Sequence, residues 1–134
     1  MAFKFEKLEV WEGALDYADR VEAIATALPN HERFNLSDQI RRAATSVALN
    51  IAEGSTGQSD AEQARFLGYA QRSLIETVAC LHLIRRRGHL ADPQPLRNAY
   101  RQAEVLLRQL VAFRRSLGAT VREDLVSYDL PPPF

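Results

Sequence analysis

The sequence predicts an all-α protein, an up-down-up-down antiparallel four-helix bundle whose copies associate. Apolar residues recur at three- and four-residue spacing in successive segments, as expected for amphipathic helices. Proline, glycine and capping residues separate these segments by short connections, which favours antiparallel neighbours. One segment, residues 39–54, lacks a broad charged face, and this indicates association with further subunits.

The first helix is expected over residues 8–28. Pro29 ends it, because proline cannot continue a helix. The predicted apolar stripe comprises Trp11, Leu15, Ala18, Val21, Ala25 and Leu28. The opposite face is mainly acidic, which we interpret as a solvated surface. Phe34 and Leu36 are expected to anchor the connection that follows.

The second helix, expected over residues 37–54, is the segment around which the prediction is organised. Residues 43–52 carry no charge. The predicted core face contains Ile40, Ala43, Ala44, Val47 and Ile51. One flank is formed by Arg42, Ser46, Asn50 and Glu53, and the other by Thr45, Ala48, Leu49 and Ala52. Because neither flank is broadly charged, we expect a neighbouring subunit to cover them.

The third and fourth helices are expected over residues 60–87 and 93–117. Ser59 begins a capping-box pattern, and Gly88 is placed to end the third helix. Pro93 suits the first position of the fourth helix. The second half of the third helix is also rich in uncharged residues, so it is expected to share the interface with the second helix.

Length and composition favour one cytoplasmic domain, residues 1–118. A chain of this size buries a core without disulfides or metal ions. Residues 119–134, with consecutive prolines and no sustained period, are expected to form an extended or partly disordered tail. Cys80 is the only cysteine, which fits a reducing compartment. No uncharged run approaches the roughly 20 residues of a membrane-spanning helix, and the start lacks a signal-peptide core.

No pattern typical of an active site is found, so we predict a protein that is not an enzyme and takes no cofactor, metal or small-molecule substrate. A di-metal carboxylate bundle needs Glu-x-x-His pairs, but Arg65 follows Glu62 at that spacing and Ala79 follows Glu76. The three histidines are scattered along the sequence, which leaves too few ligands for zinc. The loop after residue 54 lacks the lysine and the preceding strand of a phosphate loop.

Polar residues on the second helix are the first candidates for a specific role. If a neighbour covers them they need partners, since buried charges and amides are costly when unpaired. Arg42 and Glu53 lie about 16 Å apart along the helix, too far to pair with each other. We interpret them as part of an interhelical or intersubunit polar network, with a ligand or catalytic pocket as the alternative. The expected interface or network residues are Arg42, Ser46, Ala48, Leu49, Asn50 and Glu53.

Arginines form the second candidate surface. Local clusters make phosphate contacts, so the balance of 17 basic against 17 acidic residues does not exclude nucleic acid. Arginines at the end of a helix also interact favourably with its last carbonyls and with the helix dipole. A purely structural role for these arginines is therefore the alternative to nucleic-acid binding. The candidate nucleic-acid-binding residues are Arg85, Arg86, Arg87, His89, Arg97, Arg101 and Arg108.

Several stretches, in this order and spacing, resemble a family of small bacterial four-helix-bundle proteins, including those encoded in intervening sequences of 23S ribosomal RNA genes. The stretches are Phe5-x-x-Leu8-x-Val10-Trp11, Leu28-Pro29-x-x-Glu32-x-Phe34-x-Leu36, Gln39-Ile40-Arg41-Arg42-Ala43-Ala44, Asn50-Ile51-Ala52-Glu53-Gly54, Glu62 with Phe66-Leu67, and Ser73-Leu74-x-Glu76.

The resemblance implies a protomer that assembles into a ring, a homopentamer, and it implies no reaction. It also implies a relation to the accessory proteins of diversity-generating retroelements. Those proteins look like basic pentameric barrels, and they bind nucleic acid and the reverse transcriptase. This chain departs from them in being neutral overall. The resulting prediction is a non-enzymatic cytoplasmic homo-oligomeric scaffold. The alternative is an accessory protein that binds RNA or DNA, with a reverse transcriptase or ribosomal RNA as partner.

Overall fold

The computed structural model describes residues 3–57, 59–119 and 133–134, and regular structure in these ranges is helical. Four long helices follow one another along the chain, with a short 3-10 turn before α1 and another before α2. Their bounds are η1 Lys4–Lys7, α1 Glu9–Ala27, η2 Asn30–Glu32, α2 Leu36–Gly54, α3 Asp60–Arg86 and α4 Gln94–Ser116. The expected helix ends therefore differ from the observed ones by no more than one residue.

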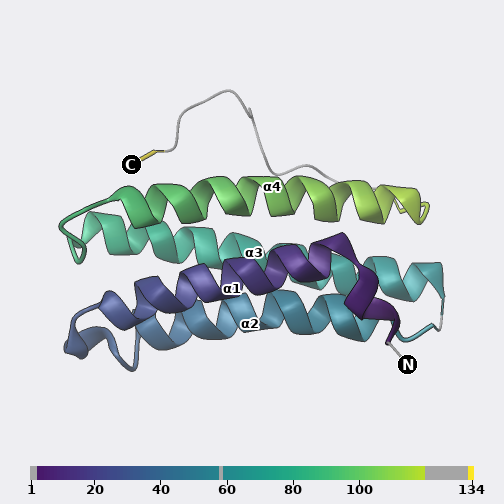
Figure 1. Ribbon diagram of the computed structural model, residues 1–134, viewed down its shortest axis with the longest axis horizontal. Coiled ribbons are helices and arrows are strands. Elements are labelled where there is room, and N and C mark those ends of the chain that lie inside the picture. Colours follow the sequence, from purple (N-terminus) through teal and green to yellow (C-terminus); the bar gives the residue numbers. More distant parts are fainter. Residues whose placement is uncertain (1–2, 58, 120–132) are drawn as a thin grey trace.

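The four helices lie side by side along the long axis of the molecule (Figure 1). The α1–α2 and α3–α4 connections lie at one end, and the α2–α3 connection lies at the other. Each helix contacts its neighbours in the chain, and α1 also contacts α4. This arrangement brings η2 close to the α3–α4 connection, although the two are far apart in sequence.

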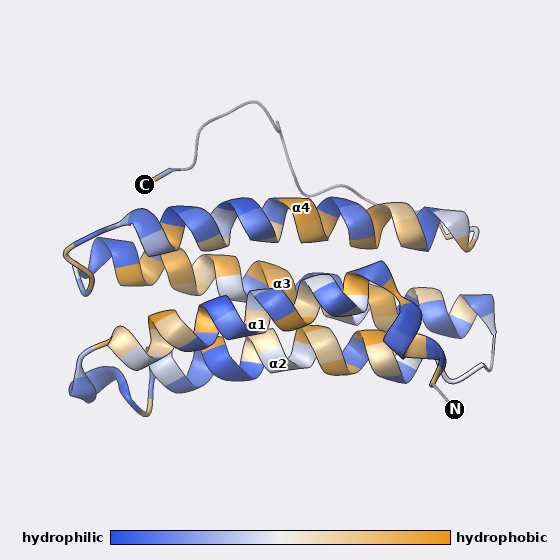
Figure 2. Cartoon of the chain, in the orientation of Figure 1, coloured by the Kyte–Doolittle hydropathy of each residue, from blue (hydrophilic) through white to orange (hydrophobic). Residues whose placement is uncertain are grey.

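A single apolar core runs between the helices. The predicted core face of α2 is confirmed, because Ile40, Val47 and Ile51 are fully buried and Ala43 and Ala44 nearly so. Hydropathy colouring shows pale and apolar residues along the middle of α2, whereas much of the outer side of α4 is hydrophilic (Figure 2). No helix in the described ranges is long and apolar enough to cross a membrane.

The predicted stripe of α1 is confirmed in its second half, where Val21, Ala25 and Leu28 are buried, and is wrong by one position in its first half. Leu15 is 36% exposed and Trp11 half-buried, while Tyr17 is fully buried. The residues that α1 buries are Val10, Ala14, Tyr17, Val21, Ile24 and Ala25. Both stripes of α1 contain apolar residues, so periodicity alone does not select the one that faces the bundle.

The two ends of α3 follow the expected chemistry, whereas Pro93, expected at the first position of α4, is its N-cap residue. The Ser59 hydroxyl accepts a hydrogen bond from the Glu62 backbone N–H at 3.1 Å, so Ser59 is the N-cap of α3. Gly88 has a φ of 67° at the end of α3, a conformation that glycine adopts without strain. There the His89 N–H reaches back to the Ile84 carbonyl at 3.4 Å, which closes the helix and fixes the direction in which His89 leaves it.

Two other expectations about connections have different outcomes. Leu36 is buried at 1% exposure, but Phe34 is 85% exposed, so only Leu36 anchors the α1–α2 connection. Phe34 instead lies beside the Arg33 guanidinium, 5.1 Å from the ring centroid. Residues 120–132 of the expected tail lie outside the described residues. Phe134, by contrast, is buried against the rings of His82 and Tyr100.

Candidate functional site: the α2 outer face and the basic bundle end

The exposed side of α2 contains residues of both flanks that are expected to meet another subunit. We define the α2 outer face as Arg42, Thr45, Leu49, Asn50 and Glu53, which line one broad hollow. Leu49 is 58% exposed, and the Arg42 side chain is 76% exposed. Charged side chains, those of Asp38, Arg41, Arg42 and Glu53, also line the hollow. The exposed leucine among them is an apolar group that gains from being covered.

Polar groups on and beside this face find partners within the protomer. Arg42 forms an ion pair with Asp38 at 3.1 Å, one helical turn away. The Ser46 and Ser73 hydroxyls are 2.8 Å apart and link α2 to α3. The Asn50 amide donates to the Ser46 carbonyl at 2.8 Å. Covering the α2 outer face therefore leaves these groups paired, which lowers the cost of burying them, whereas Glu53 makes no hydrogen bond or ion pair within the described residues.

Ala48 does not belong to the α2 outer face. It is only 6% exposed and forms part of the protomer's own core, so its assignment to an intersubunit contact is wrong. The flank Thr45, Ala48, Leu49 and Ala52 spans too wide an angle to have one environment, and Ala48 lies on its inner edge. A charge at Ala48 would consequently perturb folding, whatever its effect on association.

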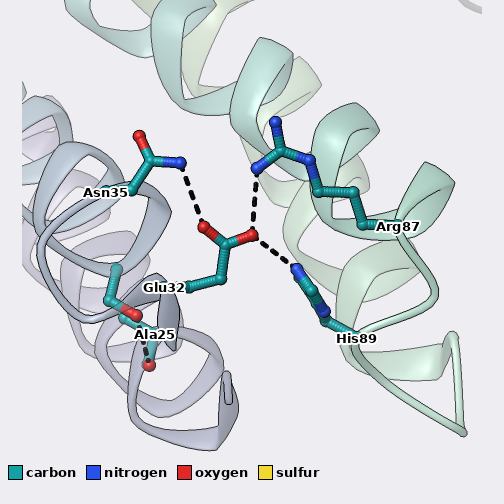
Figure 3. A network of polar contacts seen from close by, with 6 residues as sticks. Ala25, Glu32, Asn35, Arg87 and His89 are labelled. Atoms are coloured by element: carbon teal, nitrogen blue, oxygen red, sulfur yellow. Dashed lines mark hydrogen bonds and ion pairs between the residues drawn. The ribbon is translucent and has the colours of Figure 1, made fainter. Parts of the chain in front are cut away.

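The predicted arginine cluster at the end of α3 divides into two pairs of residues. Arg85 and Arg86 are exposed at the last turn of α3. Arg87 and His89 turn inward and contact the same carboxylate oxygen of Glu32 (Figure 3). The Arg87 Nη1 to Glu32 Oε2 distance is 2.9 Å, and the His89 Nε2 to Glu32 Oε2 distance is 2.5 Å. Half of the cluster is thus engaged in holding the bundle end together.

Glu32 belongs to one of the stretches that resemble the family but is not among the predicted site residues. It lies in η2 and is 3% exposed, and Asn35 donates to its second carboxylate oxygen at 3.0 Å. Burial raises the pKa of the Glu32 carboxyl, but hydrogen bonds from His89, Arg87 and Asn35 outweigh it and hold this pKa at about 2. Glu32 therefore stays ionised at neutral pH. A glutamate in a short polar connection is normally solvated, so its sequence context does not indicate this burial.

The remaining candidate arginines do not gather into one patch. Arg97 donates to the Phe134 backbone oxygen at 2.7 Å. Arg101 is exposed, whereas Arg108 is half-buried and makes an interaction within the described part of the chain. Arg97 and Arg108 are separated by about 16 Å along α4. The arginine row is a series of separate side chains with different surroundings.

Two histidines that the sequence separates meet in the structure. The ring centroids of His31 and His89 are 5.4 Å apart, at the same bundle end as Glu32. His31 and His89 are thus far apart in the sequence but close together in the folded chain. His82 lies elsewhere, on α3, with its ring 6.3 Å from that of Tyr100. Because the connections at this end are brought together by folding, only the fold reveals the pair.

Four helices around one apolar core, with a buried polar cluster that joins two connections, define an all-helical bundle protein. Residues 6–112 match the family model of the 23S rRNA-intervening sequence protein, and the chain belongs to this family. A similar solved structure is the crystal structure of a protein of unknown function from the S23 ribosomal protein family of Bacteroides thetaiotaomicron. It is 25% identical, with a TM-score of 0.72, and the match covers 79% of this chain and 98% of that one. A search of curated proteins found no match.

Proposed function

We propose that this protein is a non-enzymatic cytoplasmic scaffold, an up-down-up-down antiparallel bundle whose copies form a closed ring through the α2 outer face, with five copies as the expected number. The observation that carries the proposal is the exposure of Leu49 on the α2 outer face, where Arg42 is already paired with Asp38 and Glu53 is the second charged residue. Burying a leucine side chain contributes about 1.5–3 kcal/mol. Repeated in every copy, this gain favours association.

A ring of identical copies needs two different contact patches on each protomer, because each interface joins one face to another. Val105 on α4 is 48% exposed and supplies a second exposed apolar side chain. The helix that carries it is not a contacting neighbour of α2. Exposed apolar side chains on two helices that do not contact each other are compatible with a closed ring.

The Leu49→Glu substitution is expected to reduce the mass in solution to that of one 15.1 kDa chain, because it places a charge in the centre of the contact. Multi-angle light scattering at micromolar concentration measures the mass. Phe34→Glu is the matched control, since Phe34 is even more exposed, at 85%, but lies outside the α2 outer face. A wild-type protein of monomer mass, or a Leu49→Glu protein that keeps the wild-type mass, would rule out this interface.

A second candidate is favoured by Arg85 and Arg86, which are exposed beside each other at the end of α3. Displayed by every copy of a ring, such a pair gives repeated phosphate contacts whose weak affinities combine. In this function the protein is an accessory that binds RNA or DNA, with a reverse transcriptase or ribosomal RNA as partner. The relation to retroelement accessory proteins stays a prediction from resemblance.

The Arg85→Ala/Arg86→Ala variant is expected to bind structured RNA or duplex DNA more weakly, with a shallower dependence on salt, because about two phosphate contacts per chain are lost. Binding of labelled nucleic acid across a salt series measures both quantities. Arg65→Ala/Arg72→Ala removes the same charge from another part of α3 and is the control. Equal weakening in both variants would show that net charge, and not this pair, determines binding. Arg87 is left intact because it supports Glu32.

A further inference from the structure

Three side chains that commonly ligate metals meet where η2 faces the α3–α4 connection. One ligand atom from each of His31, Glu32 and His89 lies within 4.8 Å of the other two. We propose that these three residues bind a divalent transition-metal ion of the zinc type. The site joins two connections at one end of the bundle and lies apart from the α2 outer face.

The donor set is suited to zinc. Imidazole nitrogens and a carboxylate oxygen bind Zn²⁺ at about 2.0–2.2 Å, which places two ligands of a tetrahedral ion about 3.3 Å apart. Glu32 Oε2 and His89 Nε2 are 2.5 Å apart, so these two atoms need to move apart only slightly to admit the ion. His31 is exposed and lies in the short η2 turn, so rotation of its side chain brings its ring nitrogen closer to the ligand atoms of Glu32 and His89.

Groups around the cluster already orient two of the ligands. Asn35 donates to Glu32 Oε1, which leaves Oε2 as the oxygen that faces both His89 and Arg87 (Figure 3). The cap of α3 fixes the backbone of His89, whose side chain is 10% exposed. Such outer contacts fix the orientation of metal ligands and strengthen binding.

Arg87 is the group that opposes a cation at this place. Its guanidinium forms an ion pair with Glu32 Oε2, but the side chain is 45% exposed and reaches solvent. When zinc binds, Glu32 gives up its ion pair with Arg87, and the ion is held by this carboxylate and the two imidazoles. Three protein ligands leave a fourth position for water on the exposed His31 side.

Metal binding is expected to tie η2 to the α3–α4 connection, which are joined here by contacts between residues 57 positions apart. Any ligand that binds only the folded chain raises its stability. Zinc is thus expected to stabilise the bundle end without changing the helices, and this effect does not depend on association through the α2 outer face.

Isothermal titration of the metal-free full-length chain with zinc chloride tests the proposal, together with thermal unfolding followed by circular dichroism. We expect saturable binding of one ion per chain and a rise in Tm of about 4 °C or more at saturation. His31→Ala is expected to weaken binding by at least about tenfold. His82→Ala, which removes the histidine that lies outside the cluster, is expected to bind as the wild type does.

The His31→Ala variant is expected to keep the fold, because His31 is exposed and its ring makes no hydrogen bond in the described ranges. His89→Gln tests the site from its buried side. Absence of saturable one-to-one binding in the wild type would overturn the proposal, as would equal binding by the His31→Ala and His82→Ala variants. The number of zinc ions is counted per chain. A failure of zinc binding therefore says nothing about ring formation, which light scattering tests separately.

Discussion

The Gly54→Ala substitution will lower the free energy of unfolding by about 1–3 kcal/mol, although alanine is the better helix former. A Cβ at Gly54 would lie 2.7 Å from Phe66 Cβ and 3.3 Å from the Gln63 carbonyl oxygen. Both atoms are fixed by the backbone of α3, so rotation of a side chain does not relieve the contact. The end of α2 would have to move away from α3, and packing along both helices would loosen.

Gly13→Ala is the matched control for this prediction. A Cβ at Gly13 meets Leu106 Cδ1 at 3.4 Å, an ordinary van der Waals distance, and Gly13 lies inside α1. There the substitution is expected to raise the free energy of unfolding by about 0.5–1 kcal/mol, because alanine loses less backbone entropy than glycine in a helix. Urea unfolding of both variants measures whether each substitution raises or lowers the free energy of unfolding. Stabilisation by Gly54→Ala of the same size as at Gly13 would contradict the close approach of α2 and α3.

The Thr77→Val substitution will cost about 1–3 kcal/mol of stability, because it strands a hydroxyl in the core. Tyr17 and Thr77 are both fully buried, and their hydroxyls are 2.7 Å apart. Thr77 donates to the Leu74 carbonyl at 2.5 Å, so Tyr17 is the donor in the contact between them. Valine has nearly the shape of threonine but accepts no hydrogen bond. Burial raises the pKa of Tyr17 to about 12, so this hydroxyl keeps its proton at neutral pH and still needs an acceptor.

Tyr17→Phe provides the comparison. Removing the Tyr17 hydroxyl leaves Thr77 bonded to Leu74, so the expected loss is only about 1 kcal/mol. In the double variant no tyrosine hydroxyl is stranded, and its loss is expected to be smaller than the sum of the two single losses. Urea unfolding of the four proteins gives the coupling. Strictly additive losses would show that the two hydroxyls do not interact in the folded protein.

The helices and their ends are the part of the structure that local sequence predicts well. Ser59 at the start of α3 and Gly88 at its end behave as expected, because capping depends on residues within one helical turn. The core face of α2 is equally clear, since Ile40, Val47 and Ile51 form one stripe flanked by small residues. In the first half of α1 two apolar stripes compete, and the buried one contains Tyr17, whose hydroxyl contacts Thr77, 60 residues away.

The candidate site shows the same division. Leu49 can be selected from the sequence, because it lies in the uncharged run of residues 43–52 on one helix. Ala48, next to it in the chain, belongs to the core, and only the angle at which α2 meets its neighbours decides between them. Glu32 could not be selected, since its partners come from the α3–α4 connection and are not adjacent in sequence.

By itself, the sequence determined the helical class, the helix ends, the core stripe of α2 and the family, because each depends on spacing within a helix or on motifs in a given order. Only the tertiary structure decided which stripe of α1 is buried, how Gly54 meets Phe66, and that His31, Glu32 and His89 form one cluster. These features join residues that are distant in the chain. Their positions follow from how whole helices pack, and no local pattern encodes that packing.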